Sequence, residues 1–443
     1  MRERESWVVP ASNYAKNTFN PIRNIVENLQ IVPHPEKPMI ALSIGDPTVF
    51  GNLKPAEEIT EAVVTSIRSG KYNGYGPSTG FVESREAVAK YVSVPGVAEL
   101  EAKVSQRSMF KVLIDKCECL RNNMLSLFRE GKWEVDLACP EGADREQTAA
   151  IVVNNPSNPC GSVFSVDHLR KILEVAARNK VPVIADEIYD HFVFEGHEYQ
   201  PMASLTQEVP VLSCGGLTKR YLIPGWRMGW IAIYDRGNIL SKEIRAGLHS
   251  LSQRIIGSNT LVQGALPAIL ASTPKSFFAD TLTQIQANAK LCYSSISATP
   301  GLRPVMPQGA MYMMVGVDMA YFPDFENDLQ FVERMISEES VFCLPGKCFD
   351  FPNYVRIVLT VPKEQLQEAC NRINSFCVRH YNAPSTAVSS NGVTNGVTNG
   401  ASNGHANGNG CSNGSSYMMT SVEEAKVLAK ATAAALVAEM ETD

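Results

Sequence analysis

The stretch from residue 215 to residue 230 places a lysine in a setting suited to chemistry. Lys219 follows a short apolar strand predicted over Val209–Leu212 and a Ser-Cys-Gly-Gly turn, and Arg227 comes eight residues later. A lysine just beyond a strand end lies where open α/β sheets bind their ligands. A lysine that is partly desolvated beside another cation can lose its proton near neutral pH and attack a carbonyl carbon. The alternative is an ordinary surface lysine on a loop.

Two further polar clusters follow predicted strands. The sequence NNPSNPCG, which includes Asn158, comes directly after an apolar run, and the sequence DEIY, from Asp186 to Tyr189, follows another. Each cluster alone is weak, because an Asn-Pro pair is usually a turn and an aspartate after a strand often caps a helix. Together with Lys219 they place polar groups at three successive strand ends, which predicts a ligand site there.

The elements that must position these residues alternate along the chain. Buried strands interleaved with amphipathic helices are typical of a largely parallel sheet covered by helices on both faces. The strands of this region are predicted over 149–153, 181–185, 209–212 and 228–233, and its helices over 56–68, 84–91, 166–178, 238–270 and 275–298. A smaller α+β domain follows, with predicted strands over 310–317, 341–345 and 354–360 and helices over 328–337 and 363–380.

Residues 104–132 depart from this pattern. Their composition predicts a helix, since they contain no glycine or proline before Gly131, but they lack a clean apolar stripe. The composition changes again after His380. Residues 383–420, rich in Asn, Gly and Ser, predict a disordered linker, and residues 421–443 predict a tail with a short helix.

Composition favours a globular protein that acts on small molecules. Of its 443 residues, 44% are hydrophobic and 19% charged, enough to bury one large core or two moderate ones. Its formal net charge is −6 and its basic residues are scattered, so we expect no nucleic acid and no membrane surface as a partner.

The cysteines and the N-terminus indicate the compartment. The 11 cysteines lack the spacing of a metal site, so we expect no metal, and we interpret them as reduced, mostly buried thiols of a cytoplasmic protein. No signal segment or membrane span is predicted. Glu3 and Glu5 argue against a mitochondrial presequence but leave a mitochondrial location open.

With its polar clusters in this order, the chain resembles the class I pyridoxal-phosphate-dependent aminotransferases, which have the aspartate-aminotransferase fold. The resemblance covers roughly residues 14–382 with one gap, in the motifs SIGDPTVFGNL, KYNGYGPSTG, IVVNNPSNPCGSVFS, VIADEIY, LSCGGLTKRYLIPGWRMGW, GLRPVMPQGAMYMMVG, FENDLQFVERM and NYVRIVLTVP. It implies an α/β, fold-type-I transferase with a mostly parallel central sheet, helices on both faces and a smaller α+β domain. The implied domains are an N-terminal arm with part of the small domain (1–49), a large cofactor-binding domain (50–298) and a small C-terminal domain (299–382).

The resemblance implies roles around the cofactor pyridoxal 5′-phosphate. Lys219 would form the Schiff base with the cofactor aldehyde and then move the proton of the substrate α-carbon. Asp186 would pair with the pyridine nitrogen, and Tyr189 and Asn158 would bond the phenolic oxygen. Arg227 would hold the phosphate.

The remaining implied roles concern the substrate and a second subunit. Arg356 would bind the substrate α-carboxylate with two hydrogen bonds, beside Asn158, and Gly45 would leave room for the substrate backbone. Tyr75 would reach the phosphate of the neighbouring subunit's site, which implies a homodimer. Structural roles for Arg227, Arg356 and Tyr75 are the alternative.

The implied reaction is the transfer of an amino group from an aromatic L-amino acid, tyrosine, to the keto acid 2-oxoglutarate, a step of tyrosine and phenylalanine catabolism. The products are 4-hydroxyphenylpyruvate and glutamate. Residues 104–132 lack two features that the family has there, a Ser/Gly-rich turn that holds the phosphate and an aromatic residue that stacks on the ring. Two alternatives therefore stay open, a non-catalytic family member or partner subunit, and a lyase that uses the same cofactor and fold.

Overall fold

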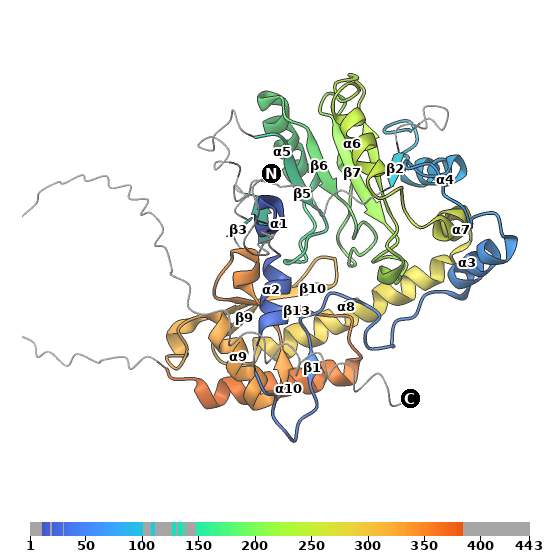
Figure 1. The fold of residues 1–443 in the computed structure, drawn as a ribbon. Helices are drawn as coiled ribbons and strands as arrows, with labels where there is room; N and C mark the ends of the chain where they lie inside the picture. The colour runs from blue at the N-terminus through green and yellow to red at the C-terminus, as the bar shows by residue number, and fades with distance from the viewer. Residues whose placement is uncertain are drawn as a thin grey trace, which may run out of the picture. The chain divides into compact units, whose positions relative to one another are not determined.

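The structure is a computed structural model, and it describes residues 11–383 except 18, 19, 30, 101–107, 111–125, 130, 131, 136 and 138–147. Residues 33–381 form one compact unit (Figure 1). Helices α1 (Asn13–Asn17) and α2 (Pro21–Asn28) belong to a separate unit. The predicted linker from residue 384 onward and the tail helix lie outside the described residues.

The larger sheet has the described strand order β2-β8-β7-β6-β5. Its strands are β2 (Ser108–Phe110), β5 (Ile151–Asn154), β6 (Val183–Asp186), β7 (Val211–Gly216) and β8 (Gly229–Tyr234). Strands β5, β6 and β7 pair in parallel, and β8 pairs antiparallel with both β7 and β2. All of these strands except β8 therefore run in one direction, which confirms the predicted mostly parallel sheet.

Helices cover both faces of this sheet (Figure 1). Val183 and Ala185 of β6 pack in one hydrophobic core with α5 (Val166–Asn179). Ile184 packs in a different core, with Leu248 of α6 (Ile244–Gln253). Because successive side chains of a strand point to opposite faces, the two cores lie on opposite sides of the sheet, as predicted.

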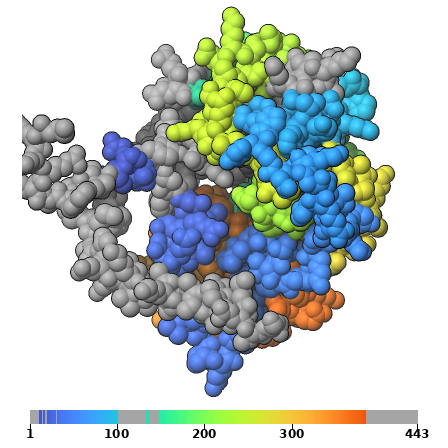
Figure 2. Space-filling model, turned by 45° about the vertical axis from the view of Figure 1, so that its right-hand side comes forward, coloured from blue at the N-terminus to red at the C-terminus, as the bar shows by residue number. Residues whose placement is uncertain are grey.

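A second group of helices packs around the loop that carries Lys219. It consists of α3 (Glu57–Ser69), α4 (Val82–Val92) and α7 (Thr260–Ser272). Their residues Ile59, Val88 and Leu266 share a core with Leu217 and Trp230, on either side of the loop. Figure 2 shows the blue segment that carries α3 and α4 along one face of the molecule.

A smaller α+β region follows. Its sheet has the order β12-β13-β10-β9, with β9 (Leu302–Pro304), β10 (Tyr312–Val317), β12 (Leu344–Pro345) and β13 (Tyr354–Val358) paired antiparallel. The neighbouring helices are α8 (Lys275–Ser297), α9 (Asp328–Glu339) and α10 (Lys363–His380). The N-terminal strand β1 (Ile40–Ala41) pairs in parallel with β11 (Val341–Phe342), so the segment before residue 45 joins this region.

The helical stretch predicted over 238–270 is two helices, α6 and α7. Between them, Ile256 and Gly257 have φ angles of +57° and +80°. Asn259 then caps α7, because its side chain accepts a hydrogen bond from the Val262 backbone nitrogen. Left-handed residues end a right-handed helix, and Ile256 gives no sequence signal of that conformation.

The predicted helix over residues 104–132 is wrong wherever the structure describes this stretch. Ser108–Phe110 is strand β2, and β3 (Ser126–Arg129) pairs antiparallel with β4 (Lys132–Val135). Pairing with neighbouring strands overrides a local helix preference, and the missing apolar stripe was consistent with that.

Two further properties of the described residues concern membrane-spanning helices and cysteines. Within the described ranges, no helix is both long and apolar enough to cross a membrane. The cysteines of these ranges are buried, and none of them forms a disulfide with another described cysteine.

Candidate active site

Three parallel strands end side by side at the candidate site. In the register of the sheet, Asn154 at the end of β5 lies opposite Asp186 at the end of β6, and Asp186 lies opposite Cys214 of β7. Lys219 follows the last residue of β7 after a short turn. The sheet therefore gathers the predicted polar groups at one edge, where α/β sheets bind ligands.

Lys219 is half-buried and its amine is held by a distant segment. Its Nζ donates a hydrogen bond to the carbonyl oxygen of Gly45, and its own carbonyl accepts one from the Leu222 nitrogen at 3.1 Å. Both ends of the residue are thus fixed, which argues against a surface lysine that moves freely in solvent.

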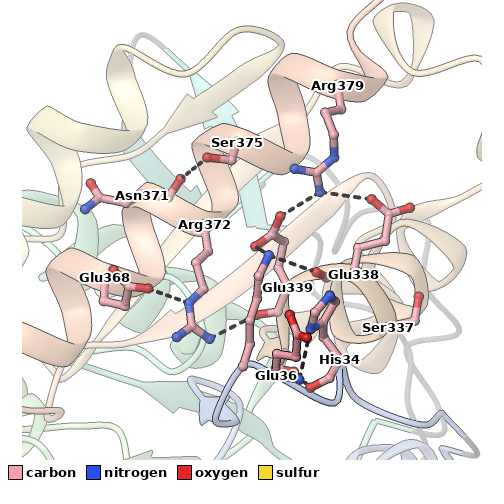
Figure 3. A network of polar contacts seen from close by, with 12 residues as sticks. His34, Glu36, Ser337, Glu338, Glu339, Glu368, Asn371, Arg372, Ser375 and Arg379 are labelled. Carbon is pink, nitrogen blue, oxygen red and sulfur yellow. Dashed lines mark hydrogen bonds and ion pairs between the residues drawn. The ribbon is translucent and has the colours of Figure 1, made fainter.

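The segment that leads to Gly45 is fastened to α9 and α10 by a polar network (Figure 3). Lys37 Nζ lies 2.5 Å from one carboxylate oxygen of Glu339, and an Arg379 nitrogen lies 2.6 Å from the other. Arg372 donates to the Glu339 carbonyl at 3.1 Å. The Glu339 side chain is only 2% exposed, so these ion pairs are poorly screened by solvent.

Beyond this network, the same segment runs along the smaller sheet. The Val358 nitrogen of β13 donates to the Leu42 carbonyl at 3.0 Å. The Arg356 guanidinium donates to the Ser43 carbonyl at 2.7 Å. Residues 37–45 therefore connect the smaller region to the lysine of the large sheet.

Arg356 is a buried cation whose bonded partners in the described residues are neutral. It is 2% exposed and donates to Asn158 Oδ1 at 2.8 Å and to the Ser43 carbonyl, while its Nε has no hydrogen-bond partner there. None of the ion pairs among the described residues includes it. Burial lowers its pKa because the charged form loses hydration. A buried guanidinium with an unused donor is suited to binding a carboxylate.

Tyr312 joins these groups, although no sequence pattern singled it out. Its ring centroid lies 4.4 Å from Arg356 Cζ, and its hydroxyl oxygen lies 2.8 Å from that of Tyr189. A Cβ at Gly45 would lie 2.5 Å from the same hydroxyl, so glycine is required there. A tyrosine at the start of a buried apolar strand needs a partner for its hydroxyl, and that was the available signal.

The phenol of Tyr189 keeps its proton at neutral pH. Burial raises its pKa well above the usual value, neighbouring Tyr312 and Asp186 raise it further, and Arg356 opposes them. Asp186 thus acts electrostatically on Tyr189, and its Oδ1 accepts a hydrogen bond from the Ile188 nitrogen at 3.4 Å.

Arg227 and Tyr75 are not brought into this cluster. The Arg227 side chain is exposed and donates to the Pro224 carbonyl at 3.1 Å. Tyr75 is 91% exposed. No described hydrogen bond of either residue reaches Lys219 or Arg356. The phosphate role of Arg227 and the intersubunit role of Tyr75 stay predictions.

A half-buried cation next to Lys219 in sequence is Arg220, which no sequence pattern identified. Its guanidinium lies 4.1 Å from the ring centroid of Phe278 and donates to the hydroxyl of Tyr91. Burial lowers its pKa to about 10.

Taken together, the site combines an amine, a carboxylate, a phenol and a buried guanidinium. An amine can bind a carbonyl compound covalently, and a guanidinium can bind a carboxylate. Among the described residues, no cluster of His, Cys, Asp and Glu side chains could hold a metal ion. This set therefore favours reactions of compounds that carry both an amino or carbonyl group and a carboxylate.

Comparisons with known proteins agree with this chemistry. The family described as aminotransferase class I and II matches residues 125–373. The chain is 51% identical over 404 residues to tyrosine aminotransferase of Homo sapiens, covering 85% of this chain and 89% of that protein. It is 42% identical over 408 residues to tyrosine aminotransferase of Dictyostelium discoideum, covering 85% and 98%. The crystal structure of tyrosine aminotransferase from Leishmania infantum is similar, with a TM-score of 0.78 and 30% identity over 85% of this chain and 100% of that chain.

Proposed function

The chain belongs to the class I and II aminotransferase family, as its resemblance implied, and we propose that it transfers the amino group of L-tyrosine to 2-oxoglutarate. The products are 4-hydroxyphenylpyruvate and glutamate, and the cofactor is pyridoxal 5′-phosphate. The names of the similar proteins support the substrate. The structural observation that carries the proposal is the buried Arg356, with its unused Nε, in the same cluster as Lys219.

The side chains at the sheet edge fit the cofactor by their chemistry. Lys219 provides an amine for the aldehyde, Asp186 a carboxylate for the pyridine nitrogen, and Tyr189 and Asn158 donors for the phenolic oxygen. Arg227, whose side chain is exposed, is the candidate for the phosphate. When bound, the cofactor supplies a sink for the electrons left when the substrate α-carbon loses its proton.

Arg356 binds and orients the substrate in this proposal. A guanidinium binds a carboxylate through two neighbouring N–H donors, and the Nε of Arg356 has no hydrogen-bond partner among the described residues. Its burial excludes water from that contact, and Arg356 is in none of the ion pairs of the described residues, so no carboxylate of these residues competes with the substrate. The same arginine serves both the amino acid and the keto acid, since both carry a carboxylate.

Lys219 moves the proton. Its Nζ leaves the Gly45 carbonyl, accepts the α-proton of the substrate as a general base and returns it later as an acid. Tyr189 stays protonated and donates a hydrogen bond, because its pKa is raised. These residues carry the half-reaction with tyrosine and, in reverse order, the half-reaction with 2-oxoglutarate.

We also propose a homodimer, supported by the exposed Tyr75. In a dimer, this ring is buried at the interface beside the neighbouring subunit's phosphate site. Sedimentation of the wild type and of Tyr75→Ala tests it. A dimer is expected, with weaker cofactor binding in the variant, and a monomeric wild type would contradict the proposal.

The proposed reaction is tested with purified protein, added cofactor, 2-oxoglutarate and tyrosine. We expect formation of 4-hydroxyphenylpyruvate, slower reaction with aliphatic amino acids, and no product with Lys219→Ala. The control variant is Lys180→Ala, since Lys180 is exposed and pairs only with Glu208, at 2.7 Å, among the described residues. A folded wild type that forms no product at saturating cofactor rules the proposal out.

A further inference from the structure

We propose that Tyr312 is a positioning residue that orients Arg356 with its ring and Tyr189 with its hydroxyl. The inference rests on the proposed function, because it assigns how the same site aligns the group that binds the substrate and the phenol that donates a hydrogen bond. One buried side chain, 1% exposed, contacts groups from separate segments of the chain. Its ring and its hydroxyl have different neighbours and therefore different effects.

The sheet register places the ring of Tyr312 under the guanidinium. Tyr312 of β10 lies opposite Val358 of β13, and Arg356 lies opposite Met314. Tyr312 and Arg356 are therefore diagonal neighbours on one face of an antiparallel pair, where large side chains meet. The backbone pairing on both strands fixes this contact, so it does not depend on a flexible loop.

Aromatic rings restrict the plane of the guanidinium. Arg356 Cζ lies 4.4 Å from the Tyr312 ring centroid and 5.2 Å from that of Phe349. A cation is attracted to the face of an aromatic ring, and the attraction is stronger where water is excluded. The rings restrict the plane of the guanidinium, and the hydrogen bonds to Asn158 and Ser43 restrict its rotation within that plane. Its unused Nε therefore points in one direction.

The hydroxyl of Tyr312 acts on Tyr189. The two hydroxyl oxygens lie 2.8 Å apart, and the rings meet edge to face with centroids 5.7 Å apart. Only one proton can lie between the two oxygens. When Tyr312 donates it, the proton of Tyr189 is left to point at a ligand, and Tyr189 becomes the stronger donor because hydrogen bonds in a chain polarise one another.

The same hydroxyl lies against the segment that holds Lys219. A Cβ at Gly45 would come within 2.5 Å of it, and the Gly45 carbonyl accepts the hydrogen bond from Lys219. Tyr312 thus contacts Arg356 and Tyr189 and lies against Gly45. A displacement of its hydroxyl would alter the position of Gly45 as well as the bond to Tyr189.

Two substitutions of Tyr312 distinguish the effect of its ring from the effect of its hydroxyl. Tyr312→Phe keeps the ring under Arg356 and removes the bond to Tyr189. We expect KM for tyrosine within about twofold of the wild type. The pH midpoint of the bound cofactor's absorbance should rise by about half a unit, because Tyr189 is then a weaker donor to the phenolic oxygen. Tyr312→Leu removes both and should also raise KM by about tenfold.

Binding of a substrate-like acid provides a readout apart from turnover. Calorimetry with 3-(4-hydroxyphenyl)propanoate and the holoenzyme should show affinity near that of the wild type for Tyr312→Phe and about tenfold weaker binding for Tyr312→Leu. The matched control is Tyr234→Phe, which removes a buried hydroxyl bonded to the Val92 carbonyl at 2.9 Å. This control should leave the midpoint and the affinity unchanged.

A double variant tests whether Tyr312 acts through Tyr189. Tyr312→Phe should shift the midpoint in the wild type but not in Tyr189→Phe. Equal shifts in both backgrounds, no shift in either, or unchanged acid binding by Tyr312→Leu would overturn the inference. A wild type without turnover overturns the proposed function and this inference with it. If the wild type turns over and the Tyr312 variants have the midpoint, KM and acid affinity of the wild type, this inference alone is overturned.

Discussion

The Nζ of Lys219 donates its hydrogen bond to the carbonyl oxygen of Gly45, a residue 174 positions earlier in the chain. Gly45 ends a segment that is fastened through Lys37 to Glu339 and through Leu42 and Ser43 to β13. The position of the lysine therefore depends on contacts that lie far from it in sequence, and substitutions at those contacts should alter the site.

Gly45→Ala should disturb the site. The new Cβ would lie 2.5 Å from the Tyr312 hydroxyl, so either that ring or the segment must shift. We expect a loss of about 1 to 3 kcal/mol in the free energy of unfolding, typical of overpacking, and at least tenfold lower kcat/KM. Urea unfolding and steady-state kinetics measure both. Gly74→Ala is the control, because a Cβ at Gly74 would meet no atom within 4 Å beyond its own chain neighbours.

Arg356→Lys should weaken substrate binding and leave the cofactor bound. Lysine keeps the charge but loses the planar pair of donors, and charge-assisted hydrogen bonds are worth about 1.5 to 3 kcal/mol each. KM for tyrosine should rise by about 10- to 100-fold, with an unchanged cofactor absorbance. The control is Arg303→Lys, an exposed arginine 3.4 Å from Asp318. Equal KM values for Arg356→Lys and the wild type would remove Arg356 from the substrate site.

Glu339→Gln should destabilise the fold more than Glu208→Gln. Glu339 is 2% exposed and pairs with Lys37 and Arg379, whose side chains are 34% and 46% exposed, whereas Glu208 and its partner Lys180 are 67% and 78% exposed. An exposed pair contributes about 0 to 1 kcal/mol and breaking a fully buried pair costs about 3 to 5 kcal/mol, so the loss for Glu339→Gln should lie between these values. Urea unfolding compares the two variants. Similar losses would mean that the network contributes little to the fold.

Glu187 should make the protein less stable as the pH rises from about 4.5 to about 7. Burial raises its pKa from 4.5 to about 7, while bonds from Ser213 and the Met202 nitrogen partly oppose the shift. Between these two pH values Glu187 holds a proton in the folded state and has lost it in the unfolded state. The free energy of unfolding therefore falls as the pH rises through this window, by up to about 3 kcal/mol in total.

Glu187→Gln should flatten that pH dependence, because an amide does not titrate and can still bond Ser213. Unfolding free energies at about pH 5 and about pH 8 measure the difference. The control is Glu195→Gln, at an exposed position. Identical slopes for the wild type and Glu187→Gln would show that another group carries the pH dependence.

The sequence was sufficient for the parts of the site that depend on local pattern. Apolar runs followed by polar residues located β5, β6 and β7, and so placed Asp186 and Lys219 at neighbouring strand ends. The contact of Tyr312 with Arg356 could not be found in this way, since it arises from the pairing of β10 with β13. Local pattern carries no information on which residues of two distant strands become neighbours.

Burial was the other quantity that the sequence did not reveal. Arg220 and Arg227 lie in the same loop, but Arg220 packs on Phe278 while Arg227 remains exposed. Spacing to Lys219 had indicated Arg227 as the cation of interest. Which arginine is desolvated depends on α8, whose packing against this loop has no local signal.

The fastening of residues 37–45 also has a consequence for biosynthesis. Lys37 leaves the ribosome long before its partner Glu339, which is 302 residues later, and before Arg379. The large sheet can form during translation, since domains fold as units as the chain emerges. The segment that provides the Gly45 carbonyl for Lys219 is held in place only after α9 and α10 have been synthesised. The observed arrangement of the site therefore requires that residues up to Arg379 have been synthesised, and a nascent chain that stops before Arg379 carries the lysine without these supporting contacts.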